Sequence, residues 1–279
     1  MSGGEVGEFL RARRARVRPE DVGLPAFGRR RVPGLRREEV AHLAGVSVDY
    51  YVRLEQGRGQ TASDAVLDAV ARVLRLDATE RAHLRALVRP PREGGTPASG
   101  SAPQRVREGV RLLLDLTTGM PAFVLGRRMD VLAWNAPADA LLGFSGLPPR
   151  ERNMARHAFL DPAARALYPD WPEVAAETAA HLRLDAGRHP GDPRLRRLLD
   201  ELTAGSPEFG PLWARQQVRE KAHGRKRMRH PRAGELDVGY ETLSLPGDRD
   251  QLLVLYTAEP GSPTAARLAA LSAASPLAV

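Results

Sequence analysis

Residues 36–58 have the sequence RREEVAHLAGVSVDYYVRLEQGR, which predicts two short helices joined by a tight turn. Apolar residues recur at helical spacing in the first of them, at Val40, Leu43 and Ala44. Gly45 follows, where the turn needs a residue without a Cβ. Ser47 is placed to cap the second helix, and Gly57 is placed to end it. The segment therefore predicts a helical pair with a defined turn.

The second helix of this pair, at residues 47–56, has an inward and an outward face. Tyr51 and Leu54 are three residues apart and are expected to point inward. Four side chains then face outward, namely Asp49, Tyr50, Val52 and Arg53. This layout is typical of a DNA-binding helix-turn-helix, whose second helix lies in the major groove. A hairpin that serves packing alone is the alternative, but the turn together with the flanking arginines favours DNA binding.

The charge of the chain is unevenly distributed. The 279 residues contain 42 Lys and Arg and 34 Asp and Glu, for a net charge of +8. Residues 1–92 contain 18 of the basic and 12 of the acidic residues, so their net charge is +6. A module that binds phosphates needs such an excess, which favours the N-terminal third as the part that contacts nucleic acid.

Composition along the chain predicts two domains. Residues 1–90 are expected to form an all-α, five-helix domain, with helices at 5–17, 36–44, 47–56, 63–74 and 78–88. The stretch PPREGGTPASGSAP at 90–103 lacks any large apolar residue, which predicts a linker at 91–103. Residues 104–260 form the second domain, and residues 261–279 a C-terminal helix or tail.

The second domain mixes the two kinds of periodicity. Helices are predicted at 106–117, 136–142, 171–186, 194–204 and 208–220. Strands are predicted at 121–127, 130–134, 225–230, 234–245 and 251–259, where β-branched and aromatic residues cluster between turn residues. Strands at both ends with helices between them indicate an α+β fold with an antiparallel sheet.

Several residues of the first domain are candidates for contact with DNA. Arg53 could bond guanine and Asp49 cytosine, with Ser47, Tyr50 and Arg58 beside them; the alternative is an i,i+4 ion pair between Asp49 and Arg53. Arg36 and Arg37 begin the first helix of the motif and are expected to meet phosphates, the alternative being solvated surface charge.

The segment GRRRV at 28–32 lies in the long connection before the motif. Arg29, Arg30 and Arg31 form either a basic arm that reaches phosphates or a minor groove, or a polar loop. Arg14 shares a helix face with Leu10, so we expect it to point inward and pair with Glu55. Breaking such a pair is costly because it leaves one charge alone.

Motifs in both halves resemble a known family, the MmyB-like transcription regulators within the XRE (lambda-repressor/Cro-like) helix-turn-helix class. The N-terminal motifs are LRARR at 10–14, GRRR at 28–31, GLRREEVAHLAGVS at 34–47 and YYVRLEQGR at 50–58. The C-terminal motifs are PAFVLGRRMDVLAWN at 121–135, RNMARHAFLDP at 152–162, SPEFGPLWARQQV at 206–218, RHP at 229–231 and YTAEPGSPTAARL at 256–268.

The resemblance implies a one-component bacterial regulator with a lambda-repressor-like domain followed by a PAS-like, ligand-binding domain. Its implied partners are double-stranded operator DNA and a small hydrophobic ligand such as a fatty acid, with an acidic ligand as the alternative. We expect a homodimer on separate grounds, because one recognition helix reads few bases and a dimer doubles the site. The short apolar runs and the charged N-terminus separately predict a cytoplasmic protein, which as a DNA-binding protein would be nucleoid-associated.

Candidate ligand contacts in the second domain are mostly large apolar residues, each with the alternative of plain core packing. They are Phe123, Leu125, Trp134, Phe159, Leu198, Trp213, Tyr240 and Leu253. His230, helped by Arg215, could hold an anionic head group, or His230 could instead hydrogen-bond within the core. Asn135 ends a strand before a helix and is expected to cap that helix.

Other classes of function lack their sequence signals. The chain has no cysteine and no paired histidine spacing typical of a metal site, so we expect neither a metal nor a cofactor. It has no nucleophile elbow, P-loop or GxGxxG motif, so we expect no enzyme. It has no long apolar run or signal-peptide core, so we expect no membrane partner. A second domain that is a ligand-free interaction or dimerisation module remains the alternative to a sensor.

Overall fold

The chain forms two compact units in a computed structural model that describes residues 2–24, 34–58, 62–89, 103–220, 222–248 and 250–273. Unit 1 comprises Met1–Gly100, Arg183–Pro193 and Trp213–Glu220. Unit 2 comprises Ser101–Leu182, Arg194–Leu212 and Lys221–Val279. Unit 1 thus includes two segments that follow the predicted linker, because Leu184 and Val218 are buried in its core. The predicted linker at 91–103 lies, except for Pro103, outside the described residues.

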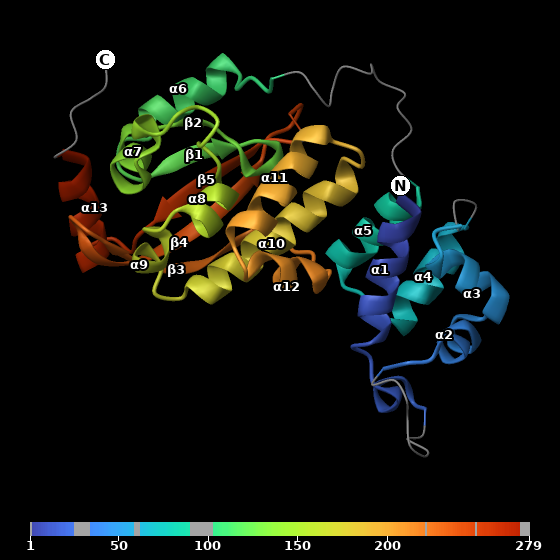
Figure 1. Ribbon diagram of the computed structural model, residues 1–279. Coiled ribbons are helices and arrows are strands. Elements are labelled where there is room, and N and C mark those ends of the chain that lie inside the picture. Colours follow the sequence, from blue (N-terminus) through green and yellow to red (C-terminus); the bar gives the residue numbers. More distant parts are fainter. Residues whose placement is uncertain are drawn as a thin grey trace. The chain divides into compact units, whose positions relative to one another are not determined.

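Unit 1 contains the five expected helices (Figure 1). They are α1 (Ser2–Arg14), α2 (Arg37–Ala44), α3 (Val48–Glu55), α4 (Asp64–Val73) and α5 (Ala78–Val88), with a short 3-10 helix at Pro19–Val22. Ser47 caps α3 by accepting a hydrogen bond from the backbone N–H of Tyr50 at 3.1 Å. Gly45 ends α2 with a φ of 69°, a conformation that glycine adopts without strain. The local sequence therefore sets both ends of the turn.

The inward faces of these helices meet in one core. Tyr51 and Leu54 of α3 are buried as expected, against Phe9 and Leu10 of α1 among others. Gly7 allows α1 to approach the end of α3 closely, because a Cβ there would lie 2.2 Å from the carbonyl oxygen of Glu55. Burial of these large apolar side chains stabilises the helix pair, which could not bury them alone.

Unit 2 is built on a five-stranded antiparallel sheet with the order β2-β1-β5-β4-β3. The strands are β1 (Ala122–Leu125), β2 (Val131–Trp134), β3 (His223–His230), β4 (Gly234–Ser244) and β5 (Leu252–Thr257). Within β1, Phe123 is paired with Trp134 and Val254, and Val124 with Ala133 and Leu253. Because side chains alternate across a strand, Phe123 and Val124 face opposite sides of the sheet. The α+β architecture with an antiparallel sheet is confirmed.

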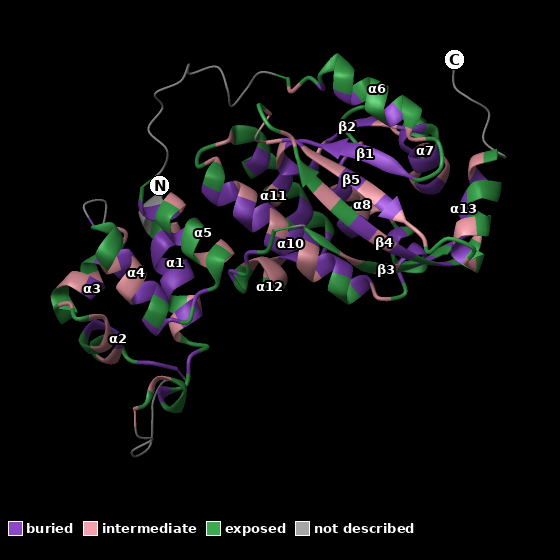
Figure 2. Cartoon of the chain, turned by 180° about the vertical axis from the view of Figure 1, so that it is seen from behind, coloured by how far each residue is buried: buried purple, intermediate pink, exposed green. Residues whose placement is uncertain are grey.

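Helices cover both faces of the central strands (Figure 1). On one side, α6 (Glu108–Leu116) packs through Val110 and Leu114 against Val124 and its neighbours. On the other side lie α8 (Met154–Leu160), α9 (Ala164–Leu167), α10 (Trp171–Arg188), α11 (Pro193–Gly205) and α12 (Phe209–Ala214). The remaining helices, α7 (Ala136–Leu142) and α13 (Pro263–Ala273), pack against each other. Figure 2 shows exposed residues within β3 and β4, where they alternate with buried or half-buried ones along much of each strand.

The sequence-based boundaries need three corrections. The expected helix at 208–220 is the shorter α12, because Gln216 has a φ of 53° that an α-helix cannot contain. Helix α1 ends at Arg14 rather than residue 17. The short helices α8 and α9 were not predicted, since seven and four residues are too few for a clear helical period.

Candidate nucleic-acid interface and ligand pocket

The outward face of α3 presents the predicted base-reading side chains together. Ser47, Asp49 and Arg53 are exposed, and Tyr50 is half-buried beside them. The guanidinium of Arg53 lies 6.0 Å from the centre of the Tyr50 ring, within the range of a cation–π contact. Within the described residues no ion pair joins Asp49 to Arg53, so both remain available to a partner. Arg58 follows α3 and is exposed.

The two arginines at the start of α2 differ in their partners. Arg36 is half-exposed and lies 3.6 Å from the exposed carboxylate of Glu38. Arg37 instead donates from Nη2 and Nε to Oε1 of Glu55, at 2.8 and 3.1 Å. These bonds raise the pKa of Arg37 above its ordinary value. The predicted arm residues Arg29, Arg30 and Arg31 lie outside the described residues.

The carboxylate of Glu55 is the centre of a three-residue cluster. Glu55 is 1% exposed at the end of α3, and Arg14 of α1 donates to it from Nε at 3.3 Å and from Nη2 at 3.4 Å. Arg14 also donates from Nη1 to the carbonyl oxygen of Leu35 at 2.7 Å. The expected Arg14–Glu55 pair is present, and Arg37 completes it from α2. The cluster joins three helices and holds α3 in place.

Several predicted ligand residues of unit 2 meet on the face of the sheet opposite α6. Phe123 contacts Phe144 and Tyr256 edge to face, with ring centres 5.5 and 5.7 Å apart. Trp134 lies 5.5 Å from Phe144, and Phe159 packs against Trp171 and Phe209. Leu125, Leu198 and Tyr240 are buried as well. These contacts are those of a packed aromatic core.

Three predicted ligand residues lie away from this aromatic face, and the ring of a fourth, His230, serves a turn. Leu253 is on the α6 face, because it is paired with Val124. Trp213 and Arg215 belong to unit 1, where the Trp213 ring stacks on the guanidinium of Arg183. The Nδ1 atom of His230 accepts the backbone N–H groups of residues 232 and 233, which serves the turn between β3 and β4.

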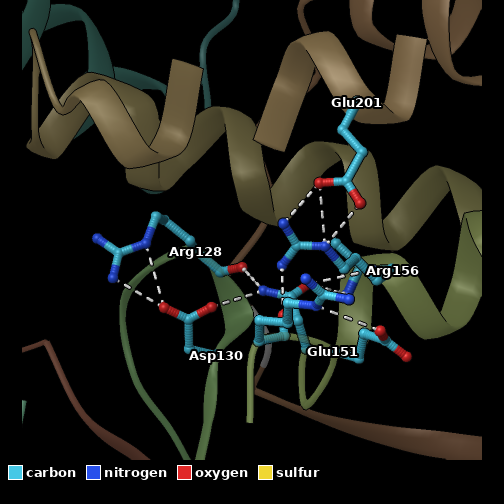
Figure 3. Close-up of polar contacts among 8 residues, drawn as sticks. Arg128, Asp130, Glu151, Arg156 and Glu201 are labelled. Carbon is cyan, nitrogen blue, oxygen red and sulfur yellow. Dashed lines mark hydrogen bonds and ion pairs between the residues drawn. The ribbon is translucent and has the colours of Figure 1, made fainter. Parts of the chain in front are cut away.

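A pocket of about 650 Å³ opens elsewhere on unit 2, and we call it the arginine pocket. Four segments that are distant in the sequence form it: residues 103–104, the turn between β1 and β2 with the start of β2, the loop that leads into α8 with Arg156 of that helix, and one face of α11. Figure 3 shows polar contacts among the last three. Its described lining residues are Pro103, Gln104, Arg128, Asp130, Val131, Leu132, Pro149, Arg150, Arg152, Arg156, Arg194, Arg197, Leu198 and Glu201. Only Leu198 among them was predicted as a ligand contact.

Two sets of polar contacts hold the walls of the arginine pocket (Figure 3). Arg128 donates from Nη2 to Oδ2 of Asp130 at 2.8 Å, and Asn153 donates from Nδ2 to Oδ1 of Asp130 at 2.8 Å. Arg156 donates from Nη2 and Nε to the Glu201 carboxylate, at 2.6 and 2.9 Å. These bonds lower the pKa of Glu201 and raise that of Arg156. Both carboxylates of the pocket therefore already accept hydrogen bonds from residues of its own walls.

One signal for this pocket was present in the sequence. Arg194, Arg197, Leu198 and Glu201 have the spacing i, i+3, i+4 and i+7, which places them on one helix face. The other segments that line the pocket carry no such local pattern. Within the described residues no three His, Asp or Glu side chains converge as a metal site requires. The same residues contain no helix with both the length and the apolar character needed to cross a bilayer.

The two units define a class of protein, a helix-turn-helix DNA-binding module joined in one chain to an α+β module with a pocket. Comparisons with known families agree: residues 5–84 match a helix-turn-helix domain, and residues 106–271 match the MmyB-like transcription regulator ligand binding domain. The chain belongs to the MmyB-like transcription regulators, which confirms the resemblance seen in its motifs. No curated protein matches the chain.

Proposed function

We propose that this transcription regulator is a one-component, sequence-specific switch that reads operator DNA with α3. The observation that carries the proposal is the outward row formed by α3 and its cap. Ser47, Asp49 and Arg53 are exposed there, and half-buried Tyr50 lies beside them, so these side chains are available for base edges. A helix inserted in the major groove contacts bases through such a row. Acting on DNA, the protein would work in the cytoplasm at the nucleoid.

Phosphate contacts would flank this helix. We assign them to Arg36, Arg37 and Arg58, with the arm residues Arg29–Arg31 as further contacts. Arg37 keeps about half of its side chain exposed, at 48%, while Glu55 fixes its guanidinium. A guanidinium that is already oriented loses less conformational entropy when it binds a phosphate. The Glu55 cluster would therefore serve DNA binding as well as stability.

We further propose that the chain acts as a homodimer joined through unit 2. One recognition helix reads few base pairs, and a dimer doubles the site. Three leucines of α6 are each more than half exposed and form a stripe on one side of that helix, namely Leu112, Leu113 and Leu116. A second copy of the same stripe would cover them in a two-fold symmetric contact.

Selection of bound duplexes from a random-sequence pool with the full-length protein tests the operator proposal. We expect an enriched motif with two-fold symmetry and half-sites centred about 10 base pairs apart, or a multiple of that spacing. Salt-dependent binding without any enriched motif would overturn sequence-specific reading. Analytical ultracentrifugation of the wild type and Leu116→Asp then tests the dimer, which the substitution should dissociate.

Unit 2 would control DNA binding by linkage, because a ligand that prefers one arrangement of the chain shifts operator affinity by its differential binding energy. We consider two chemical classes of ligand: a hydrophobic molecule such as a fatty acid, which the family resemblance implies, and an acidic molecule. The aromatic face of the sheet would have to open for the first, whereas the arginine pocket suits the second. A ligand-free interaction module is the alternative, and native mass spectrometry before and after organic extraction separates it from a sensor.

A further inference from the structure

The described lining of the arginine pocket carries an excess of positive charge. Its two carboxylates, those of Asp130 and Glu201, face six guanidiniums, namely those of Arg128, Arg150, Arg152, Arg156, Arg194 and Arg197. At neutral pH the lining therefore has four more positive than negative charges. Like charges gathered in a concave surface repel one another and focus a positive potential, which attracts anions.

One wall of the pocket is a face of α11, which a buried leucine fixes to the core of unit 2. Leu198 of α11 is 2% exposed and anchors this face in the core. Arg194 precedes Leu198 by one helical turn and Arg197 precedes it by one residue, and both arginines are exposed. Glu201, one turn further on, holds Arg156 across the pocket through the bonds described above. The charged side chains thus stand on a rigid element rather than on a loop.

The opposite wall is a turn held in an unfavourable conformation. Arg128 and Met129 have φ values of 59° and 63°, in the left-handed region where non-glycine residues are strained. Asn153 supports this turn by donating from Nδ2 to the carbonyl oxygen of Arg128 at 2.8 Å. The same Asn153 caps α8 by accepting the N–H of Ala155 at 2.9 Å. Strain maintained by such support is typical of functional sites, and here it aims Arg128 at the pocket.

We propose that the arginine pocket binds a small molecule with at least two anionic groups, either phosphates or carboxylates. The inference rests on the proposed function, since it names the ligand class that unit 2 would sense. A volume of about 650 Å³ is in the range of small-molecule sites. One guanidinium can bind two oxygens of a single carboxylate or phosphate group. Because guanidiniums stand on two walls of the pocket, a ligand with two anionic groups can contact both walls at once.

Isothermal titration of the full-length protein with pyrophosphate and with citrate tests this proposal and separates the phosphate from the carboxylate source. Acetate at matched ionic strength is the control for a single anionic group. We expect saturable binding of pyrophosphate or citrate, and none of acetate. Absence of saturable binding for both probes, or equal binding of acetate, overturns the proposal.

A matched pair of variants on α11 locates the site. Arg197 lines the pocket and has no ion pair among the described residues, whereas its exposed neighbour Arg196 lies outside the lining. Arg197→Ala should weaken the binding of the active probe about tenfold, because a hydrogen bond to a charged group is lost. Arg196→Ala should leave it unchanged. Equal loss in both variants indicates a diffuse surface effect and overturns the proposal.

DNA measurements on the same proteins keep the two proposals apart. If the protein selects an operator motif but binds no anion, the pocket proposal is wrong and the regulator proposal stands. If the protein binds anions saturably but selects no motif, sequence-specific DNA reading is wrong and the pocket proposal stands. The third outcome concerns a 20-base-pair duplex. If the duplex displaces the probe, and if Arg197→Ala weakens its binding while Arg196→Ala does not, the pocket is a nucleic-acid surface and the small-molecule assignment is overturned.

Discussion

The Nη2 atom of Arg37, at the start of α2, lies 2.8 Å from Oε1 of Glu55, at the end of α3. The two residues enclose the helix-turn-helix motif, and their ion pair ties its two ends together. Because Glu55 also accepts from Arg14 of α1, the spacing of both motif helices depends on one buried carboxylate. Stability and the positioning of α3 are therefore linked in unit 1.

Replacing Arg14 with alanine should destabilise unit 1. The substitution removes the two hydrogen bonds to Glu55 and the one to the carbonyl oxygen of Leu35, and leaves Arg37 as the remaining partner of a buried charge. We expect a loss of about 2–3 kcal/mol in the free energy of unfolding. Urea denaturation measures it, with Arg72→Ala, an exposed arginine of α4, as the control. An unchanged midpoint for Arg14→Ala would show that the cluster contributes no stability.

Replacing Arg53 with alanine should abolish operator preference without unfolding the domain. The side chain is exposed on α3, so its loss removes no buried contact. A bidentate contact with a base is worth about 1–3 kcal/mol of discrimination. Footprinting on the selected motif should show protection by the wild type and by Arg72→Ala, and none by Arg53→Ala. An unaltered footprint for Arg53→Ala would place the recognition surface elsewhere.

His83 should make unit 1 less stable in mild acid. It is 2% exposed beside Phe9, and burial, followed by the nearby charges of Arg183, Arg13 and Arg188, lowers its pKa to about 3 from 6.5. Between those values the unfolded chain binds a proton that the folded chain does not, so stability is full above pH 6.5 and falls as the pH drops toward 3.

Because of His83, we expect the free energy of unfolding to fall by about 1 kcal/mol between pH 7 and pH 5.5. This window lies above the titration of most carboxylates. His83→Leu removes the titrating group, and a comparison of urea midpoints at the two pH values measures the difference. A pH dependence of the variant equal to that of the wild type would mean that another group titrates in this window.

Replacing Asn135 with alanine should cost more than the loss of an ordinary helix cap. Its Oδ1 accepts the N–H groups of Ala138 and Ala122, and its Nδ2 donates to the carbonyl oxygens of Thr117 and Met120. Because the side chain is buried, we expect a loss of about 2–3 kcal/mol.

The cap of α13 gives a matched comparison for Asn135. Within the part of the chain that the structure describes, the hydroxyl of Ser262 makes one hydrogen bond, in which it accepts the N–H of Ala265. Ser262→Ala should therefore cost about 1 kcal/mol. Thermal unfolding of the two variants compares them directly. Equal shifts in melting temperature would show that the bonds from Asn135 to β1 and to the loop after α6 contribute nothing beyond capping.

Much of the fold follows from local patterns in the sequence. The helices of unit 1 and the strands of unit 2 agree with the predictions to within a few residues, because periodicity and capping act between near neighbours. The capping roles of Ser47 and Asn135 and the inward direction of Arg14 were predicted for the same reason. The base-reading roles on α3 remain predictions.

Local sequence patterns do not predict which of the candidate ligand residues lie together. Residue type predicts ligand contacts for both Phe123 and Leu253, yet the two side chains face opposite sides of the sheet, since strand register decides which residues share a face. His230 could be chosen for its chemistry, but its Nδ1 is committed to the β3–β4 turn. Residue type alone does not reveal a side chain's neighbours.

The sequence by itself determined that a helix-turn-helix precedes an α+β domain, because hydrophobic period, glycine turns and caps are local properties of the chain. Only the tertiary structure decided that Glu55 joins Arg14 to Arg37, and that Arg128, Arg156 and Arg197 line one pocket. Those side chains come from segments far apart in the sequence, and the packing of the core brings them together. Charge complementarity between distant segments has no period that the sequence alone displays.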